Sequence, residues 1–119
     1  MVGTWLLDSD TSCHVTLHKS QFEQYSARHF DSVQVGNSQH RAIIVIDIVE
    51  LNLLGGPTLV LHNVQHVIEL SSPLISIRQL DEDGIHVGFS LGGWTLHGVS
   101  LLLARGPKVH SLYQLYVTL

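Results

Sequence analysis

The chain has 119 residues, of which 45% are hydrophobic and 13% charged, and its formal net charge is -4 at pH 7. This length suffices for one domain with a buried core and is too short for two, so we expect a single domain over residues 1–119. No apolar run reaches the ~20 residues that cross a bilayer, and the six Lys and Arg residues form no basic stripe, so neither a membrane nor nucleic acid is an expected partner.

Short β-branched and apolar runs recur between turn residues and predict a mostly β fold. The predicted strands of the first half are residues 4–7, 13–17, 32–35, 43–53, 58–61 and 66–70. Those of the second half are 85–89, 94–97, 100–104 and 112–118, with turns at Asp83-Gly84, Gly92-Gly93 and Arg105-Gly106-Pro107. A turn roughly every 8–12 residues is typical of a small barrel or sandwich.

Helix is expected in two short segments only. Residues 19–25 predict a turn or two of helix after a Ser20 cap, and residues 75–81 predict another that ends before Asp83 and Gly84. No fixed-period repeat, low-complexity tract or linker divides the chain. We therefore expect it to act as one unit.

An acidic segment follows the first predicted strand. Asp8-Ser9-Asp10-Thr11 comes directly after the apolar residues 5–7, which places a carboxylate at the end of a buried strand. Aspartic proteases carry an Asp-Ser/Thr-Gly triplet in this setting, where the glycine lets the backbone turn tightly beside the reacting carboxylate. The third position here is Asp10. The alternative interpretation of this segment is a solvated Asx-turn without catalytic function.

The single cysteine and the nine histidines are further candidates for reactive or metal-binding groups. Cys13 cannot form an internal disulfide, which favours a reducing, cytoplasmic compartment. His14 and His18, like His62 and His66, have the i, i+4 spacing that suits zinc on a helix. Both pairs fall in predicted strands, where that spacing separates them by ~13 Å, so we expect no metal and no cofactor.

Four motifs follow one another along the chain. They are Trp-Leu-Leu-Asp-Ser-x-x-Ser-x-His-Val-Thr from residue 5, Val-Gly-Asn from residue 35, Leu-x-Asn-Val-x-His-Val from residue 61 and Leu-Ile-Ser-Ile-x-Gln-Leu from residue 74. This ordered series resembles the protease region of plant copia-type retrotransposon polyproteins. Residues 94–113 continue the resemblance as the segment that leads toward integrase, and residues 82–119 either close the same barrel or form an appended β segment.

The resemblance implies a retropepsin-like fold, a small closed β-barrel in which each chain of a homodimer supplies one catalytic aspartate. Asp8 matches that aspartate, and Ser9 matches the residue whose hydroxyl ties the two active-site loops together across the dimer axis, with Asp10 and Thr11 completing the loop. Two carboxylates a few ångströms apart cannot both ionise, so one holds a proton while the other activates water. The implied substrate is an extended peptide or polyprotein, and the implied location is intracellular, including virus-like particles.

Two departures from the family pattern bear on activity. Asp10 replaces the glycine, so a twofold axis would gather four carboxylates and shift their pKa values by ~1–3 units per close neighbour. The family's flap carries Gly-Ile-Gly where this chain has Val45-Ile46-Asp47, a sequence that favours a plain strand. We therefore expect an aspartic endopeptidase module of impaired competence. The alternative is a catalytically dead or domesticated module that keeps the dimer and peptide binding.

Overall fold

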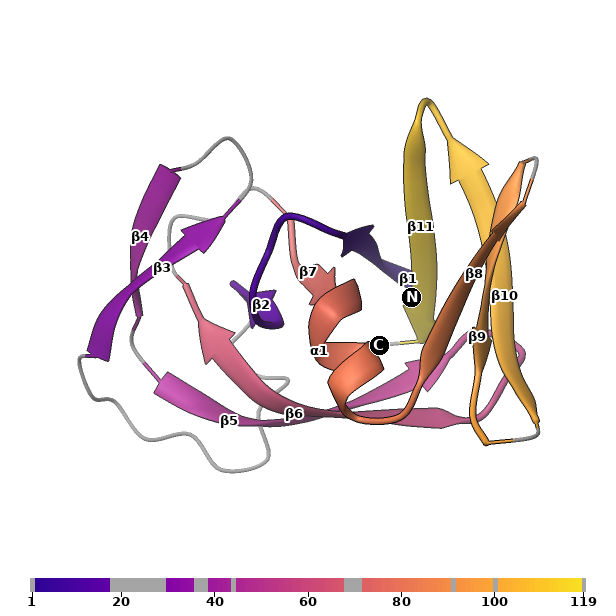
Figure 1. Ribbon diagram of the computed structural model, residues 1–119, viewed down its shortest axis with the longest axis horizontal. Helices are drawn as coiled ribbons and strands as arrows, with labels where there is room; N and C mark the ends of the chain where they lie inside the picture. Colours follow the sequence, from indigo (N-terminus) through magenta and orange to yellow (C-terminus); the bar gives the residue numbers. More distant parts are fainter. Residues whose placement is uncertain are drawn as a thin grey trace.

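The computed structural model describes residues 2–17, 30–35, 39–43, 45–67, 72–90, 92–99 and 101–118, with side chains described for residues 3–17, 48–67 and the last three of these ranges. The helix predicted over residues 19–25 lies outside the described residues. The described chain is mostly strand with one short helix, which confirms the predicted fold class at that level (Figure 1).

The strands and the helix follow one another along the chain as β1 (Val2–Asp8), β2 (Val15–Thr16), β3 (Phe30–Val35), β4 (Gln39–Ile43), β5 (Val45–Leu53), β6 (Thr58–His66), β7 (Leu74–Ser76), α1 (Ile77–Glu82), β8 (His86–Ser90), β9 (Gly93–His97), β10 (Leu102–Val109) and β11 (Leu112–Thr118).

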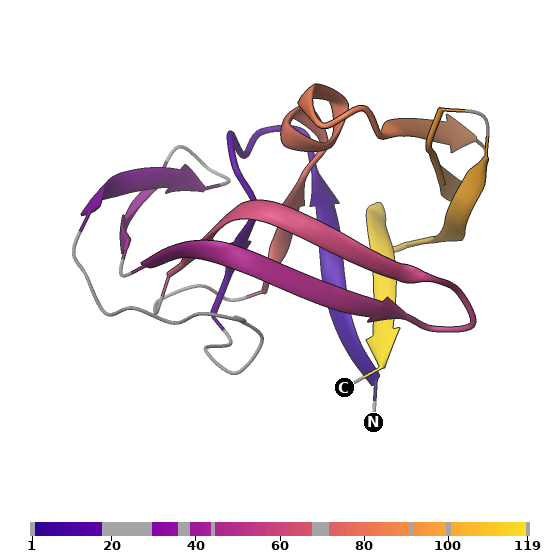
Figure 2. The same cartoon turned by 90° about the horizontal axis from the view of Figure 1, so that it is seen from below.

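Nine of these strands form one sheet in the order β1-β7-β2-β6-β5-β11-β10-β9-β8, and β3 pairs with β4 in a separate two-stranded sheet. An additional pairing joins β1 to β11, so the series β1-β7-β2-β6-β5-β11 returns to its first strand. The β1–β11 pairing is antiparallel and runs from Val2 opposite Thr118 to Leu6 opposite Gln114, which places the two ends of the chain side by side (Figure 2). β11 thus pairs with strands of the same chain.

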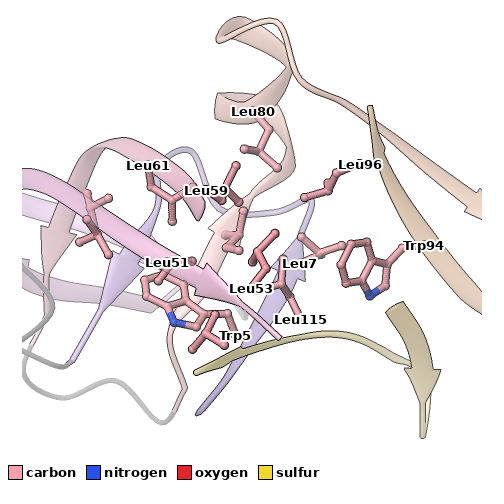
Figure 3. Close-up of a cluster of buried hydrophobic side chains, with 14 residues drawn as sticks. Trp5, Leu7, Leu51, Leu53, Leu59, Leu61, Leu80, Trp94, Leu96 and Leu115 are labelled. Atoms are coloured by element: carbon pink, nitrogen blue, oxygen red, sulfur yellow. The ribbon is translucent and has the colours of Figure 1, made fainter. Parts of the chain in front are cut away.

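The core follows from the alternation of apolar side chains along the strands, because successive residues of a strand point to opposite faces. Fourteen buried residues from both halves of the chain form the main cluster (Figure 3). They are Trp5, Leu7, Val49, Leu51, Leu53, Leu59, Leu61, Val64, Ile75, Leu80, Trp94, Leu96, Leu115 and Val117. A smaller cluster of Cys13, Val15, Val67 and Leu74 lies around β2.

Helix α1 begins two residues later than the sequence predicted. Ile75 is fully buried and continues β7, which pairs in parallel with β1, and Ser76 is the N-cap. The cap holds because the Ser76 hydroxyl accepts a hydrogen bond from the Gln79 N–H at 3.0 Å. The helix ends where predicted, at Asp83 and Gly84, the latter with φ +83°.

Two predicted strand breaks were wrong. Residues 58–66 form one strand, with an irregular register near Asn63, whose φ is +59°, so the polar residues there produce a bulge and no turn. Arg105-Gly106-Pro107 lies inside β10. Gly106 has no side chain and so leaves room for the Trp94 ring that packs on it. At Pro107, β10 pairs only with β9. Proline has no backbone N–H, but its nitrogen faces the unpaired edge of β10, so no hydrogen bond between strands is lost.

Candidate active-site loop

Asp8 is the last residue of β1 and lies opposite Ser76 of the parallel strand β7. Its side chain is partly exposed. One carboxylate oxygen, Oδ1, accepts a hydrogen bond from the Asp10 N–H at 2.7 Å, and Oδ2 accepts one from the Thr11 hydroxyl at 3.3 Å. The carboxylate therefore organises the loop that follows it, in the geometry of an Asx-turn.

The rest of the loop has one buried and two exposed positions. Ser9 and Asp10 are exposed, whereas Thr11 retains 1% of its accessible surface. The non-glycine residues with positive φ in the described chain are Asn63, His110 and Ser111. Asp10 is not among them, so this loop does not need glycine's conformational freedom at its third position.

Ser76 fixes the loop from the other side. Its hydroxyl donates a hydrogen bond to the Thr11 carbonyl at 2.8 Å while accepting the one from Gln79, and its N–H donates to Nδ1 of His14 at 3.0 Å. The hydroxyl and the N–H of this buried serine are thus both used. The strand carrying Asp8, the loop, and the start of α1 are joined at one residue.

His14 is fully buried, and its hydrogen bond defines its protonation state. Because Nδ1 accepts the Ser76 N–H, the proton of the neutral ring must be on Nε2, which is buried without a partner in the described chain. Burial lowers the pKa of His14 to about 4; nearby His62 contributes in the same direction, and Asp83 opposes it. The imidazole is therefore a neutral structural group at neutral pH.

Cys13, next to this histidine, is not arranged as a nucleophile. Burial raises the pKa of its thiol to about 11, only partly offset by a hydrogen bond with Ser12. Since the thiolate is the reactive form, the thiol is unreactive near neutral pH. The nucleophile or general base that this region offers is the Asp8 carboxylate.

The flap residues expected from the sequence lie at the start of β5. Val45, Ile46 and Asp47 are opposite His66, Gln65 and Val64 of β6, in a regular antiparallel pairing. Their side chains lie outside the described part of the structure. In the sheet order, β7, β2 and β6 lie between β1 and β5. Among the described hydrogen bonds, none joins Val45, Ile46 or Asp47 to the Asp8 loop.

The candidate metal-binding histidines do not form a common site in the described residues. His62 is exposed, whereas His66 is buried with its Nε2 3.2 Å from the Leu17 carbonyl oxygen. His18 lies outside the described residues. Over the described ranges, no group of three His, Cys, Asp or Glu side chains could hold a metal ion, and no helix there is long and apolar enough to cross a membrane.

The sequence led directly to Asp8 but not to the residues that hold its loop. The sequence offers a sign of the role of Ser76, because this residue is polar and lies inside the apolar run from Leu74 to Ile77. The sign is weaker for His14, which only lies three residues beyond Thr11 in the first motif.

Comparison with known proteins places these features in context. A protein-family model described as "Pol polyprotein, beta-barrel domain" matches residues 5–85. The chain is 36% identical over 110 residues to the "Retrovirus-related Pol polyprotein from transposon TNT 1-94" of Nicotiana tabacum, an alignment that covers 92% of this chain. The same alignment spans 8% of the tobacco polyprotein. No solved structure matches the chain significantly.

Proposed function

Since this chain belongs to the family of Pol polyprotein beta-barrel domains, we propose that it is the retropepsin-like aspartic endopeptidase module of a copia-type retrotransposon polyprotein. The observation that carries the proposal is the position of Asp8, partly exposed at the end of β1, on a loop fixed by Ser76. In this proposal the returning strand series β1-β7-β2-β6-β5-β11 is the closed barrel of that fold. The module acts in the cytoplasm, including virus-like particles.

The proposed mechanism requires two copies of the chain. Two Asp8 carboxyls at the dimer axis share one proton, so that the ionised one activates water as a general base and the protonated one donates to the scissile carbonyl oxygen. Ser9 ties the two loops together across the axis. An extended peptide or polyprotein segment binds as an added strand between the loop and the flap residues Val45, Ile46 and Asp47, without a cofactor.

The effect of Asp10 on this mechanism is electrostatic. The residue is exposed and does not have positive φ, so it introduces no backbone strain within one chain. At a twofold axis, however, two copies of Asp8 and two of Asp10 bring four carboxylates together, and their mutual repulsion opposes the close approach of the two Asp8 side chains. We therefore expect slow cleavage that is confined to acidic pH.

The test uses a fluorogenic peptide taken from a junction of a related polyprotein. At about pH 5, we expect Asp10→Gly to cleave it at least ~10-fold faster than the native chain, with a further gain when Val45 and Asp47 are also replaced by glycine. Asp8→Asn abolishes cleavage in every background. Cleavage that survives Asp8→Asn, or a native chain as fast as Asp10→Gly, would refute this assignment of roles.

The second candidate is a catalytically dead or domesticated descendant that retains dimerisation or peptide binding. It is favoured by the hydrogen bonds within the loop, because both oxygens of Asp8 are engaged by Asp10 and Thr11. Its signature is a chain that dimerises and binds a junction peptide but gives no product at any pH, even after Asp10→Gly. Product formation by the Asp10→Gly variant would instead favour the protease.

A further inference from the structure

A groove lies between β10, the β5–β6 turn and β11. Figure 1 shows these elements on the side of the molecule away from the small β3–β4 sheet. Its cavity measures about 390 Å³, within the ~300–1,000 Å³ range of ligand-binding pockets. Trp94, Leu53 and Leu115 are buried residues in its lining. None of the active-site loop residues lines it, so whatever occupies it binds independently of Asp8.

One wall of the groove is the part of β10 around Arg105, which has no paired strand on the edge away from β9 among the described residues. The Lys108 N–H donates to the Gly92 carbonyl at 2.9 Å, which directs this residue toward β9. Backbone groups alternate between the two edges of a strand, so Arg105 presents its N–H and C=O to the other edge. Among the described residues, β10 pairs with β11 only through Lys108 and Val109, which leaves the main chain of Arg105 available to a ligand.

The rim of the groove is apolar and exposed. Leu54 of the β5–β6 turn and Leu102 of β10 line the cavity with 56% and 47% of their surfaces exposed, and the adjacent Leu101 is 66% exposed. Large apolar side chains gathered around a cavity mark a surface that is covered by a partner. The apolar surface extends beyond the cavity itself, which suits a polypeptide better than a small molecule.

The charge of the groove indicates what kind of polypeptide fits. Arg105 is the sole charged residue of the lining, and in the part of the chain that the structure describes its guanidinium makes no ion pair. A guanidinium recognises a carboxylate through parallel hydrogen bonds. A second copy packed groove to groove would instead repeat the same patch across a twofold axis and bring two Arg105 cations together without an acidic residue in either lining.

We propose that this groove docks an extended, acidic segment of a partner polypeptide. One apolar side chain of the segment fills the cavity against Trp94, its main chain bonds to the N–H and C=O of Arg105, and an Asp or Glu next to the apolar residue pairs with the Arg105 guanidinium. Backbone pairing supplies part of the affinity, and the pocket with its cation supplies specificity.

The experiment is an NMR titration of the ¹⁵N-labelled chain with an acetylated, amidated heptapeptide that has a central leucine flanked by two glutamates. We expect saturable shifts at the Trp94 indole N–H and the Arg105 amide, with an affinity that falls as salt is added. Arg105→Gln weakens binding roughly tenfold. The matched control is Lys108→Gln, which removes the same charge from the same strand outside the lining and changes the affinity less than about twofold.

Three results would overturn the proposal. The first is the absence of shifts at the lining up to ~5 mM peptide. The second is equal binding of a peptide with lysines in place of the glutamates. The third is self-association of the chain that is lost in Arg105→Gln, which would place a second copy in the groove. Leu102→Gln, a change on the exposed rim, supplies an independent variant that should also weaken peptide binding.

Discussion

At the scale of single residues, the Asp8 loop depends on a histidine that must remain neutral. His14 accepts the Ser76 N–H through Nδ1, and a protonated imidazole has no acceptor left. Protonation would therefore break the bond that connects this residue to β7 and the start of α1. The acidic pH at which the proposed protease is expected to act would thus disturb the structure that positions Asp8.

This dependence predicts an acid-labile fold. Burial lowers the pKa of His14 to about 4 in the folded chain, whereas an unfolded chain has a histidine pKa of ~6.5. Between these values the unfolded state binds the extra proton, so the free energy of unfolding falls as the pH drops from about 6.5 to about 4, by about 3 kcal/mol from this residue. Urea denaturation across this pH range measures the loss.

The variant His14→Asn separates titration from structure. The asparagine Oδ1 can replace Nδ1 as acceptor for Ser76, but the amide does not titrate. We expect the pH dependence between about 6.5 and 4 to flatten in this variant, even if its stability at neutral pH is lower. An unchanged slope would show that other groups cause the acid sensitivity.

At the scale of secondary-structure elements, Trp94 connects β9 to β10 and to β11. Its indole N–H donates to the Gln114 carbonyl at 2.8 Å, and its ring packs against Gly106, where an added Cβ would overlap the ring carbons. We expect Gly106→Ala to lower the free energy of unfolding by ~1–3 kcal/mol through overpacking. Thermal denaturation compares it with Gly98→Ala, where φ is not positive and the nearest atoms lie 3.8–3.9 Å from the added Cβ. Equal losses of unfolding free energy in the two variants would show that overlap with the Trp94 ring is not the cause.

The β10–β11 turn should yield a gain in stability. His110 and Ser111 have φ of +50° and +70°, the combination found in type I′ hairpin turns, which favour Asn-Gly. Left-handed backbone conformations are costly for residues with a Cβ. Ser111→Gly should therefore raise the free energy of unfolding by up to ~1 kcal/mol, measured by chemical denaturation. A loss of stability would mean that the serine has a compensating contact.

Elements with a strong local pattern were predictable, and those set by distant contacts were not. The buried alternation of β5, β6 and β11 follows from their sequences. The turn predicted at Arg105-Gly106-Pro107 failed because a strand tolerates Gly beside a packed ring and Pro on an unpaired edge. The contacts of Ser76 with His14 and Thr11 join residues 62 and 65 positions apart. They arise from the parallel β1–β7 pairing, which local propensity does not encode.

At the scale of the whole molecule, the pairing of β1 with β11 brings both ends of the chain into the main sheet. The chain is therefore held together by its own strands β1 and β11, and it carries one Asp8 loop. The N-terminal part of this assembly, residues 5–85, matches the Pol beta-barrel family, and the groove at β10 lies mainly in the later part of the chain. The proposed cleavage site and the proposed docking groove can therefore be disrupted separately.

Disulfide trapping of a chain carrying Asp8→Cys and Cys13→Ser tests the central claim most directly. If two protomers bring their Asp8 carboxyls within a few ångströms, mild oxidation gives a covalent dimer on a non-reducing gel, because a disulfide requires Cα atoms roughly 4.4–6.8 Å apart. Ser90→Cys in the same Cys13→Ser background, at an exposed strand end, should remain monomeric. A chain that stays monomeric at high micromolar concentration, or that crosslinks equally well at both positions, would contradict a shared aspartate site.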